Sequence, residues 1–196
     1  KENDPDAVGP VKSAAAIKEE LRDIKEALPD QISDKVTVSS DPLGVALEMQ
    51  GEICFRGGSV DMNQAMMDIL DVASEQLMTH PKDLRRIFVQ GHSDNMPVGG
   101  KLKKQYPTNW ELSAARAAVV VNYLITVKNI NPTRLQASGF ADRWPFGIDF
   151  MQIRETVKED DGSYRSYVDD ALIREYNNTP DKRSQNRRIK IVFSPS

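Results

Sequence analysis

The stretch that most constrains the fold is Gln90-Gly-His-Ser-Asp94, followed after a polar loop by Tyr-Pro-Thr-Asn-Trp-Glu-Leu-Ser-Ala-Ala-Arg-Ala at 106–117. The Ile-Phe-Val run before Gln90 is β-branched or aromatic, and Gly91 interrupts it, which predicts the end of a strand. Thr108 and Glu111 have the spacing of a capping box, which satisfies two backbone donors at a helix start. The chain is therefore expected to pass from a buried strand through a loop into a helix at about 109–128.

The winding of this helix places polar side chains beside its apolar face. At about 3.6 residues per turn, the expected apolar stripe consists of Leu112, Ala115, Val119 and Tyr123. Three polar residues share a narrow arc along the edge of that stripe: Asn109, Ser113 and Arg116. Arg116 is then expected where the helix meets the sheet, level with Asp94 and across a groove closed by the loop 95–107.

Asp94 and Arg116 suit the recognition of a zwitterion better than catalysis. A carboxylate accepts hydrogen bonds from an ammonium group, and a guanidinium group binds a carboxylate through two parallel hydrogen bonds. The spacing alone is equally consistent with a simple ion pair between the two residues. They do not form a general acid/base couple, because arginine stays protonated.

Composition limits the class of protein. The chain of 196 residues is 39% hydrophobic and 28% charged, which predicts one globular domain with appendages. A net charge of −3 argues against a nucleic-acid partner, which would favour a basic excess. No apolar run approaches the length of about 20 residues that spans a bilayer. No signal peptide is visible, and because the chain begins at Lys1 without a methionine, it is expected to be a processed or excised fragment.

The first 40 residues are predicted to form a linker and a helix. Residues 1–11 are polar and contain prolines, which is typical of a flexible segment. Residues 12–28 place four apolar side chains on one helical face: Ile17, Leu21, Ile24 and Leu28. Two interpretations of this stripe stay open, which are packing against the domain and a contact in a dimer.

Residues 41–196 are predicted to form the main domain. A short strand at 36–38 and a turn at 41–44 precede a half-buried strand with Val45, Leu47 and Met49 alternating. A helix follows from about 62 to 77, then the strand at 86–90, the helix at 109–128 and a strand at 135–138. A last strand alternates at Ile189, Ile191 and Phe193. This order predicts an α/β fold, an α+β sandwich with helices packed on a mixed sheet.

Several separated motifs resemble the OmpA-like peptidoglycan-binding domain over about 45–194. They are Gly91-His-Ser-Asp94, Asn109-Trp-Glu-Leu-Ser113 with Arg116-Ala117, Gly139-Phe140, and Asn186-Arg-Arg188. The sequence Tyr-Pro-Thr-Asn-Trp-Glu-Leu-Ser is most similar to the corresponding motif in MotB-type stator proteins of the flagellar motor. The resemblance implies the β-α-β-α-β-β fold of that family. About 146–182 departs from it as an insertion, for which a β-hairpin at 153–168 and a short helix at 169–176 are expected. This insertion is a candidate for contacting a partner or the ligand.

The resemblance also implies a ligand and its site. Diaminopimelate of peptidoglycan offers an ammonium and a carboxylate on one terminus, for which Asp94 and Arg116 are the implied partners. Asn109, Ser113 and Arg187 match motif positions that line the same groove, and the loop after Asp94, beginning at Asn95, is expected to contribute backbone amides. We expect a periplasmic, non-catalytic wall anchor, part of an inner-membrane-anchored stator subunit that forms a homodimer and meets a MotA-like partner through a preceding membrane helix. The alternatives are an outer-membrane tether of the OmpA or Pal kind and a stator-like subunit of a defence or transport machine.

Enzyme chemistry is not expected. His92, Ser93 and Asp94 are consecutive at a strand end, where side chains point in different directions and cannot form a catalytic relay. His80, His92 and Cys54 do not make a metal-ligand cluster, and no cofactor is implied. Cys54 lies among apolar neighbours and is expected to be a buried, inert thiol. His92 is expected to be a structural residue beneath the groove.

Overall fold

The alternating strands assemble into one mixed sheet with a small separate hairpin. The computed structural model describes residues 12–80 and 83–195, so the predicted flexible segment 1–11 lies outside the described residues. The strands are β1 (Val36–Asp41), β2 (Gly44–Gln50), β3 (Ile87–His92), β4 (Leu135–Gly139), β5 (Thr156–Lys158), β6 (Tyr164–Ser166) and β7 (Arg188–Phe193). Five of them form the main sheet in the order β1-β2-β7-β3-β4, in which only β3 and β4 run parallel.

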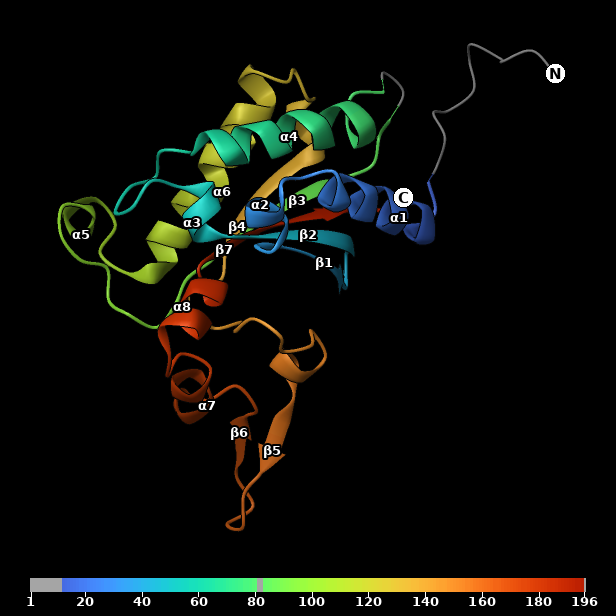
Figure 1. The fold of residues 1–196 in the computed structure, drawn as a ribbon. Coiled ribbons are helices and arrows are strands. Elements are labelled where there is room, and N and C mark those ends of the chain that lie inside the picture. The colour runs from blue at the N-terminus through green and yellow to red at the C-terminus, as the bar shows by residue number, and fades with distance from the viewer. Residues whose placement is uncertain (1–11, 81–82, 196) are drawn as a thin grey trace.

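Helices cover one face of this sheet (Figure 1). The α-helices are α1 (Ala14–Glu26), α2 (Asp30–Ser33), α3 (Gly51–Cys54), α4 (Gln64–Leu77), α5 (Leu102–Gln105), α6 (Asn109–Thr126), α7 (Asp170–Glu175) and α8 (Pro180–Asn186), with 3₁₀ turns at Pro132–Arg134 and Gln152–Arg154. The order β2-α4-β3-α6-β4-β7 is the expected β-α-β-α-β-β arrangement. The prediction of an α/β fold with helices packed on a mixed sheet is therefore confirmed.

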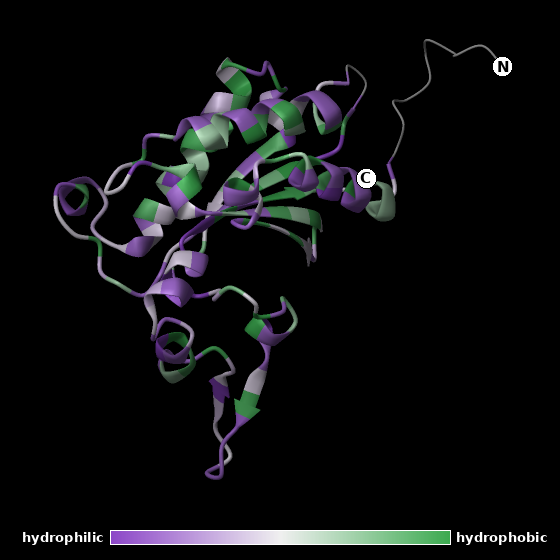
Figure 2. Ribbon diagram, in the orientation of Figure 1, coloured by the Kyte–Doolittle hydropathy of each residue, from purple (hydrophilic) through white to green (hydrophobic). Residues whose placement is uncertain are grey.

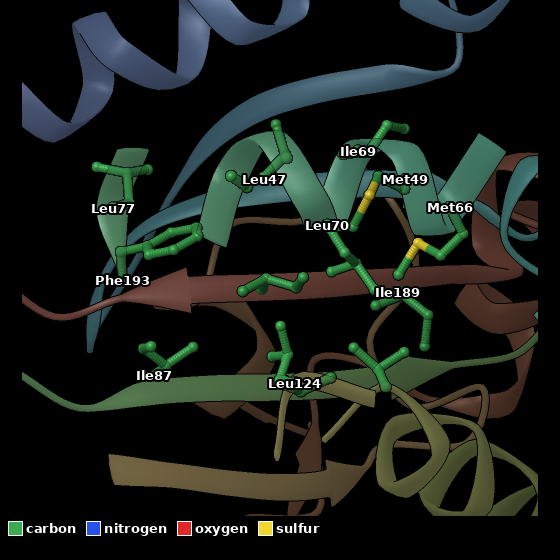
Figure 3. Close-up of a cluster of buried hydrophobic side chains, with 14 of the residues drawn as sticks. Leu47, Met49, Met66, Ile69, Leu70, Leu77, Ile87, Leu124, Ile189 and Phe193 are labelled. Carbon is green, nitrogen blue, oxygen red and sulfur yellow. The ribbon is translucent and has the colours of Figure 1, made fainter. Parts of the chain in front are cut away.

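The main core lies between α1, α4, α6 and the sheet. Figure 3 shows side chains of α4 and of the strands pointing toward one another, among them Leu70, Leu47 and Ile189. All three are at most 1% exposed. Burial of such side chains is the main favourable contribution to folding, on the order of 1.5–3 kcal/mol each.

The amphipathic stripe of α1 packs into this same core. Ile17, Leu21 and Ile24 are at most 2% exposed and belong to the main cluster. The helix contacts α4, β1 and β2. Of the two interpretations of this stripe, the structure supports packing against the domain, because these three side chains belong to the main core.

The buried face of α6 differs from the predicted stripe. Leu112 is buried as expected, but Ala115, Val119 and Tyr123 are only partly buried, and the face that meets the sheet consists of Ser113, Ala117, Val120 and Leu124. Small residues at 113 and 117 let the helix approach β3 and β4 closely. The predicted stripe was wrong because it was chosen mostly from the larger apolar side chains. Tyr123 instead reaches sideways, and its hydroxyl donates to Asp71 of α4 at 2.9 Å.

The insertion contains the predicted hairpin and helix. β5 and β6 pair antiparallel, and α7 follows with Asp169 as its N-cap. The segment has a small core of its own around Trp144, Ile148, Val168 and Ile173. It forms a lobe on the side of the sheet opposite α1 and α4 (Figure 1), and Figure 2 shows that its hairpin tip is largely hydrophilic, in contrast to the strands of the main sheet.

The second face of the sheet carries buried charges beneath the start of the insertion. Lys190 pairs with Asp41 at 2.8 Å, and Arg188 pairs with Glu48 at 2.9 Å. The Trp144 ring lies 4.0 Å from the Lys190 ammonium nitrogen, and the Trp144 carbonyl accepts a hydrogen bond from Arg188. These partners satisfy charges that would otherwise be costly to bury.

Cys54 is fully buried in the main core, and burial raises the pKa of its thiol to about 12. The expectation of an inert thiol is confirmed, since reaction requires a thiolate. Within residues 12–80 and 83–195, no helix combines the length and the apolar character that crossing a membrane requires.

Candidate functional site

The site lies at the carboxyl end of β3, where α6 begins. The strand continues through Gly91 to His92, so this glycine does not end it as predicted. A Cβ atom at Gly91 would lie 2.0 Å from the Ser113 carbonyl oxygen, and one at Gly139 would lie 2.6 Å from the Ala114 nitrogen. The two glycines therefore allow α6 to pack directly on the backbones of β3 and β4, which brings its first turns beside Asp94.

Hydrogen bonds hold the loop that follows Asp94. The Asp94 Oδ1 atom accepts from the Met96 amide at 3.0 Å. Asn109 Nδ2 donates to the carbonyl oxygens of Asp94 and Met96, at 3.2 and 2.9 Å. The predicted capping box at Thr108 and Glu111 is confirmed and fixes the start of α6. Asn109 thus positions the loop as well as lining the site.

Asp94 pairs with Arg187 rather than with Arg116. Arg187 Nη1 lies 2.5 Å from Asp94 Oδ2, and the two residues are 93 positions apart in the chain. Arg116 instead donates from Nη2 to the Ser59 carbonyl at 3.0 Å, and its guanidinium group lies over the Phe55 ring, 5.2 Å from the ring centre. The alternative in which Asp94 and Arg116 form a simple ion pair is therefore not what the structure shows.

A pocket of about 500 Å³ brings the charged residues together. Asp94, Asn109, Arg116 and Arg187 all line it, below an apolar wall that includes Val98 and Leu112. In Figure 1 the surrounding elements α3, α5 and α8 gather at the same end of the sheet. A pocket of mostly apolar lining with a few convergent charged groups is typical of a small-ligand site.

The charges in this pocket favour an anion. Burial is the main cause that lowers the pKa of Arg116, and the neighbouring Arg187 guanidinium lowers it further. Arginine nevertheless remains protonated at neutral pH. The buried Nε atom of Arg116 has no hydrogen-bond partner. Asp94 pairs with Arg187, which leaves the Arg116 guanidinium group without a carboxylate partner, so a bound carboxylate would neutralise it.

Two of the expected site residues lie outside the pocket lining. Ser113 is 1% exposed, and its hydroxyl donates to the Trp110 carbonyl and accepts from the Ala141 amide. Asn95 donates from its backbone amide to Asn177 Oδ1 of the insertion at 3.2 Å. Both residues support the walls of the site. Their hydrogen bonds connect the backbone around Asp94 to the insertion and the backbone at Ala141 to α6.

The segment 55–59 contributes to the site, which was not predicted from the sequence. The Phe55 ring and the Ser59 carbonyl hold the guanidinium group of Arg116, and Gly58 lines the pocket. The signal was the Gly-Gly pair at 57–58, since an exposed glycine pair next to an arginine is typical of a loop that approaches a ligand.

His92 lies beneath the site as a neutral structural residue. It is 2% exposed, and its ring stacks on Phe140 at 5.0 Å between centres. Burial, with Arg188 and Lys190 nearby, holds the pKa of His92 well below its usual value of 6.5. One ring nitrogen lies 3.4 Å from Gln90 Oε1. Across the described part of the chain, no three His, Cys, Asp or Glu side chains are grouped so as to hold a metal ion.

Residues 54–149 match the OmpA family. Two curated proteins of Bacillus subtilis (strain 168) are similar to the chain. The uncharacterized protein YtxE is 28% identical over 85% of this chain and 55% of its own length, and Motility protein B is 24% identical over 92% of this chain and 59% of its own length. The chain thus spans little more than half the length of these relatives.

Solved structures share the fold. A putative MotB-like protein from Desulfovibrio vulgaris superposes with a TM-score of 0.66 at 18% identity, over 94% of this chain and 95% of that one. The cell wall anchor of the T6SS from Pseudomonas aeruginosa superposes with a TM-score of 0.60 at 22% identity, over 93% of this chain and 99% of that one. At these identities the likeness describes the fold.

Proposed function

We propose that this chain, whose residues 54–149 match the OmpA family and which is similar to Motility protein B, binds peptidoglycan and anchors a membrane complex to the cell wall. The single observation that carries the proposal is the convergence of Asp94, Arg116 and Arg187 on one pocket. This set of groups matches a ligand terminus that bears an ammonium and a carboxylate side by side, as diaminopimelate does.

The ligand carboxylate binds Arg116. The guanidinium group is held in place by Phe55 and Ser59, so little freedom is lost when the ligand binds. The ligand ammonium binds Asp94. Each Asp94 oxygen already accepts one hydrogen bond in this structure, from Met96 and Arg187, but a carboxylate has about four lone-pair sites. Asp94 therefore accepts the ammonium while Arg187 stays beside it.

The whole protein is a stator-like subunit in this proposal. The domain lies in the periplasm, a membrane helix N-terminal to the domain joins a MotA-like partner, and two copies act together. The support is the similarity to Motility protein B over most of this chain. A dimer strengthens wall binding without new contacts, because the second domain binds at a high effective concentration once the first is bound.

A second candidate function has the same ligand, peptidoglycan, but anchors a different protein complex. The chain shares its fold over nearly its whole length with the cell wall anchor of the T6SS. The same pocket then anchors a transport or defence complex, or acts as a structural tether of the OmpA or Pal kind. Removal of the parent gene separates these candidates, since only loss of a motor subunit abolishes swimming while leaving secretion and envelope integrity intact.

A sedimentation assay with purified, diaminopimelate-containing peptidoglycan tests wall binding. The unaltered chain is expected to sediment with the wall, whereas Asp94→Ala and Arg116→Ala stay in solution while folded by circular dichroism. Arg22→Ala serves as the control, because its side chain is 52% exposed on α1, far along the chain from the pocket. If the unaltered chain stays in solution, or if both pocket variants sediment as it does, the proposal fails.

A further inference from the structure

A second pocket lies on the other side of the two site arginines. It also has a volume of about 500 Å³, and its lining includes Glu52, Phe55, Arg56 and Asn63. It lies between the start of α3 and the connection to α4, a region to which the zwitterion site above assigns no ligand.

The two pockets are contiguous. Arg116, Arg187 and Gly58 line both of them. A Cβ atom at Gly57 or Gly58 would meet nothing within 4 Å, so no neighbouring atom crowds the shared rim at these glycines. A ligand that occupies the first pocket can therefore continue into the second along this rim.

The charge of the second pocket also favours an anion. Its one carboxylate, Glu52, is already neutralised, with Lys35 at 2.7 Å and a hydrogen bond from Ser184 at 2.9 Å. These bonds hold the pKa of Glu52 below its usual value. In the described part of the chain, neither Arg56 nor Arg116 has a carboxylate partner of its own. Two guanidinium groups without an ion-pair partner therefore face this space, next to Arg187, which pairs with Asp94.

We propose that the second pocket is an anion subsite that binds a further carboxylate of the same wall peptide. The inference rests on the proposed function, because it takes the zwitterionic residue to be bound in the first pocket. An extended peptide advances by about 3.3–3.6 Å per residue, so a carboxylate on the next residue lies within reach of the shared rim. Arg56 is the specificity-determining residue, since its planar guanidinium group matches a carboxylate and it does not line the first pocket.

Titration calorimetry with two synthetic peptides tests this subsite. Both peptides contain diaminopimelate, and they differ only in whether the adjacent acidic residue bears a carboxylate or the isosteric carboxamide. The unaltered chain is expected to bind the carboxylate form about tenfold more tightly, the size of one charge-assisted hydrogen bond. In Arg56→Gln the preference is expected to fall below about twofold, and Arg56→Lys retains part of it as a point charge. Arg22→Gln keeps the full preference.

The outcomes separate the subsite from the anchor function. If both peptides bind the unaltered chain equally, or if Arg56→Gln keeps the tenfold preference, the subsite is refuted while wall binding stands. If neither peptide binds, the anchor function and the subsite fall together.

Discussion

Replacement of Gly91 by alanine tests whether close contact between α6 and β3 builds the site. The added Cβ atom would lie 2.0 Å from the Ser113 carbonyl oxygen and 2.7 Å from its carbon. Real Cβ atoms do not approach heavy atoms within 3.0 Å, so helix and strand must separate by at least 1.0 Å, the difference between 3.0 and 2.0. Both contacts are to backbone atoms, which cannot rotate away as the end of a flexible side chain can.

The expected loss of stability follows from that separation. Overpacking in a core costs about 1–3 kcal/mol, and a contact between two backbones lies at the upper end, so Gly91→Ala should lower the free energy of unfolding by about 3 kcal/mol. For a chain of this size, such a loss lowers the melting temperature by about 6–12 °C. Because α6 carries Asn109 and Arg116, its displacement by about 1 Å should also weaken peptidoglycan binding, since binding groups must be held within about 0.5 Å.

Urea denaturation followed by circular dichroism measures the first effect, and peptidoglycan sedimentation measures the second. Gly99→Ala is the matched control for stability, since a Cβ at this loop glycine would meet nothing within 4 Å, and its cost should stay within about 0.5 kcal/mol. Because Gly99 lines the pocket, Arg22→Ala is the control for peptidoglycan binding. Equal denaturation midpoints for the two variants would refute the role assigned to the glycine.

Three further perturbations have defined outcomes. The pKa of His92 is depressed in the folded state, so the unfolded state binds a proton first. The free energy of unfolding should therefore be constant above the unfolded pKa of about 6.5 and fall by up to about 1.4 kcal/mol per pH unit below it. Urea denaturation midpoints measured between about pH 7.5 and 5.5 should show a smaller fall for His92→Gln. Leu70→Ala should lower the free energy of unfolding by about 2–5 kcal/mol by opening a cavity in the core, whereas Leu84→Ala, at a side chain that is 77% exposed, should change it by less than about 0.5 kcal/mol. Lys190→Met should cost about 3–5 kcal/mol because it leaves the Asp41 carboxylate buried and unpaired, and thermal unfolding of Lys190→Met with and without Asp41→Asn should show the second change restoring part of the loss. If the double variant is no more stable than the single one, the cost arises from packing against Trp144 instead.

Local patterns in the sequence were sufficient for the secondary structure near the site. The capping box at Thr108 and Glu111 depends on residues three apart, and strand alternation such as Leu47 with Met49 depends on residues two apart. Such signals act within one element, so they identify helices and strands without knowledge of their neighbours. The hairpin of the insertion was predictable for the same reason, from the Asp-Gly turn at 161–162.

Contacts between distant residues were not predictable in this way. The ion pair between Asp94 and Arg187 depends on how β7 pairs with β3, which sets the position of a side chain 93 residues away. The rotation of α6 depends on Gly91 and Gly139, whose missing side chains act only when the helix is in place. The buried charges on the second face of the sheet were equally unpredictable, because a lysine in a strand is expected to be exposed to solvent, and only the fold places the Trp144 ring over Lys190.

The position of α1 has a mechanical consequence. Lys12 donates to the Gln76 carbonyl near the end of α4, whereas Gly58 of the pocket precedes the start of that helix. The 14 residues of α4 span about 21 Å, so α1 begins at one end of the sheet and the pocket lies at the other (Figure 1). In an anchor with this layout, tension runs lengthwise along β2, β7 and β3. Their ladders of hydrogen bonds then bear the load together in shear, instead of being peeled apart one bond at a time.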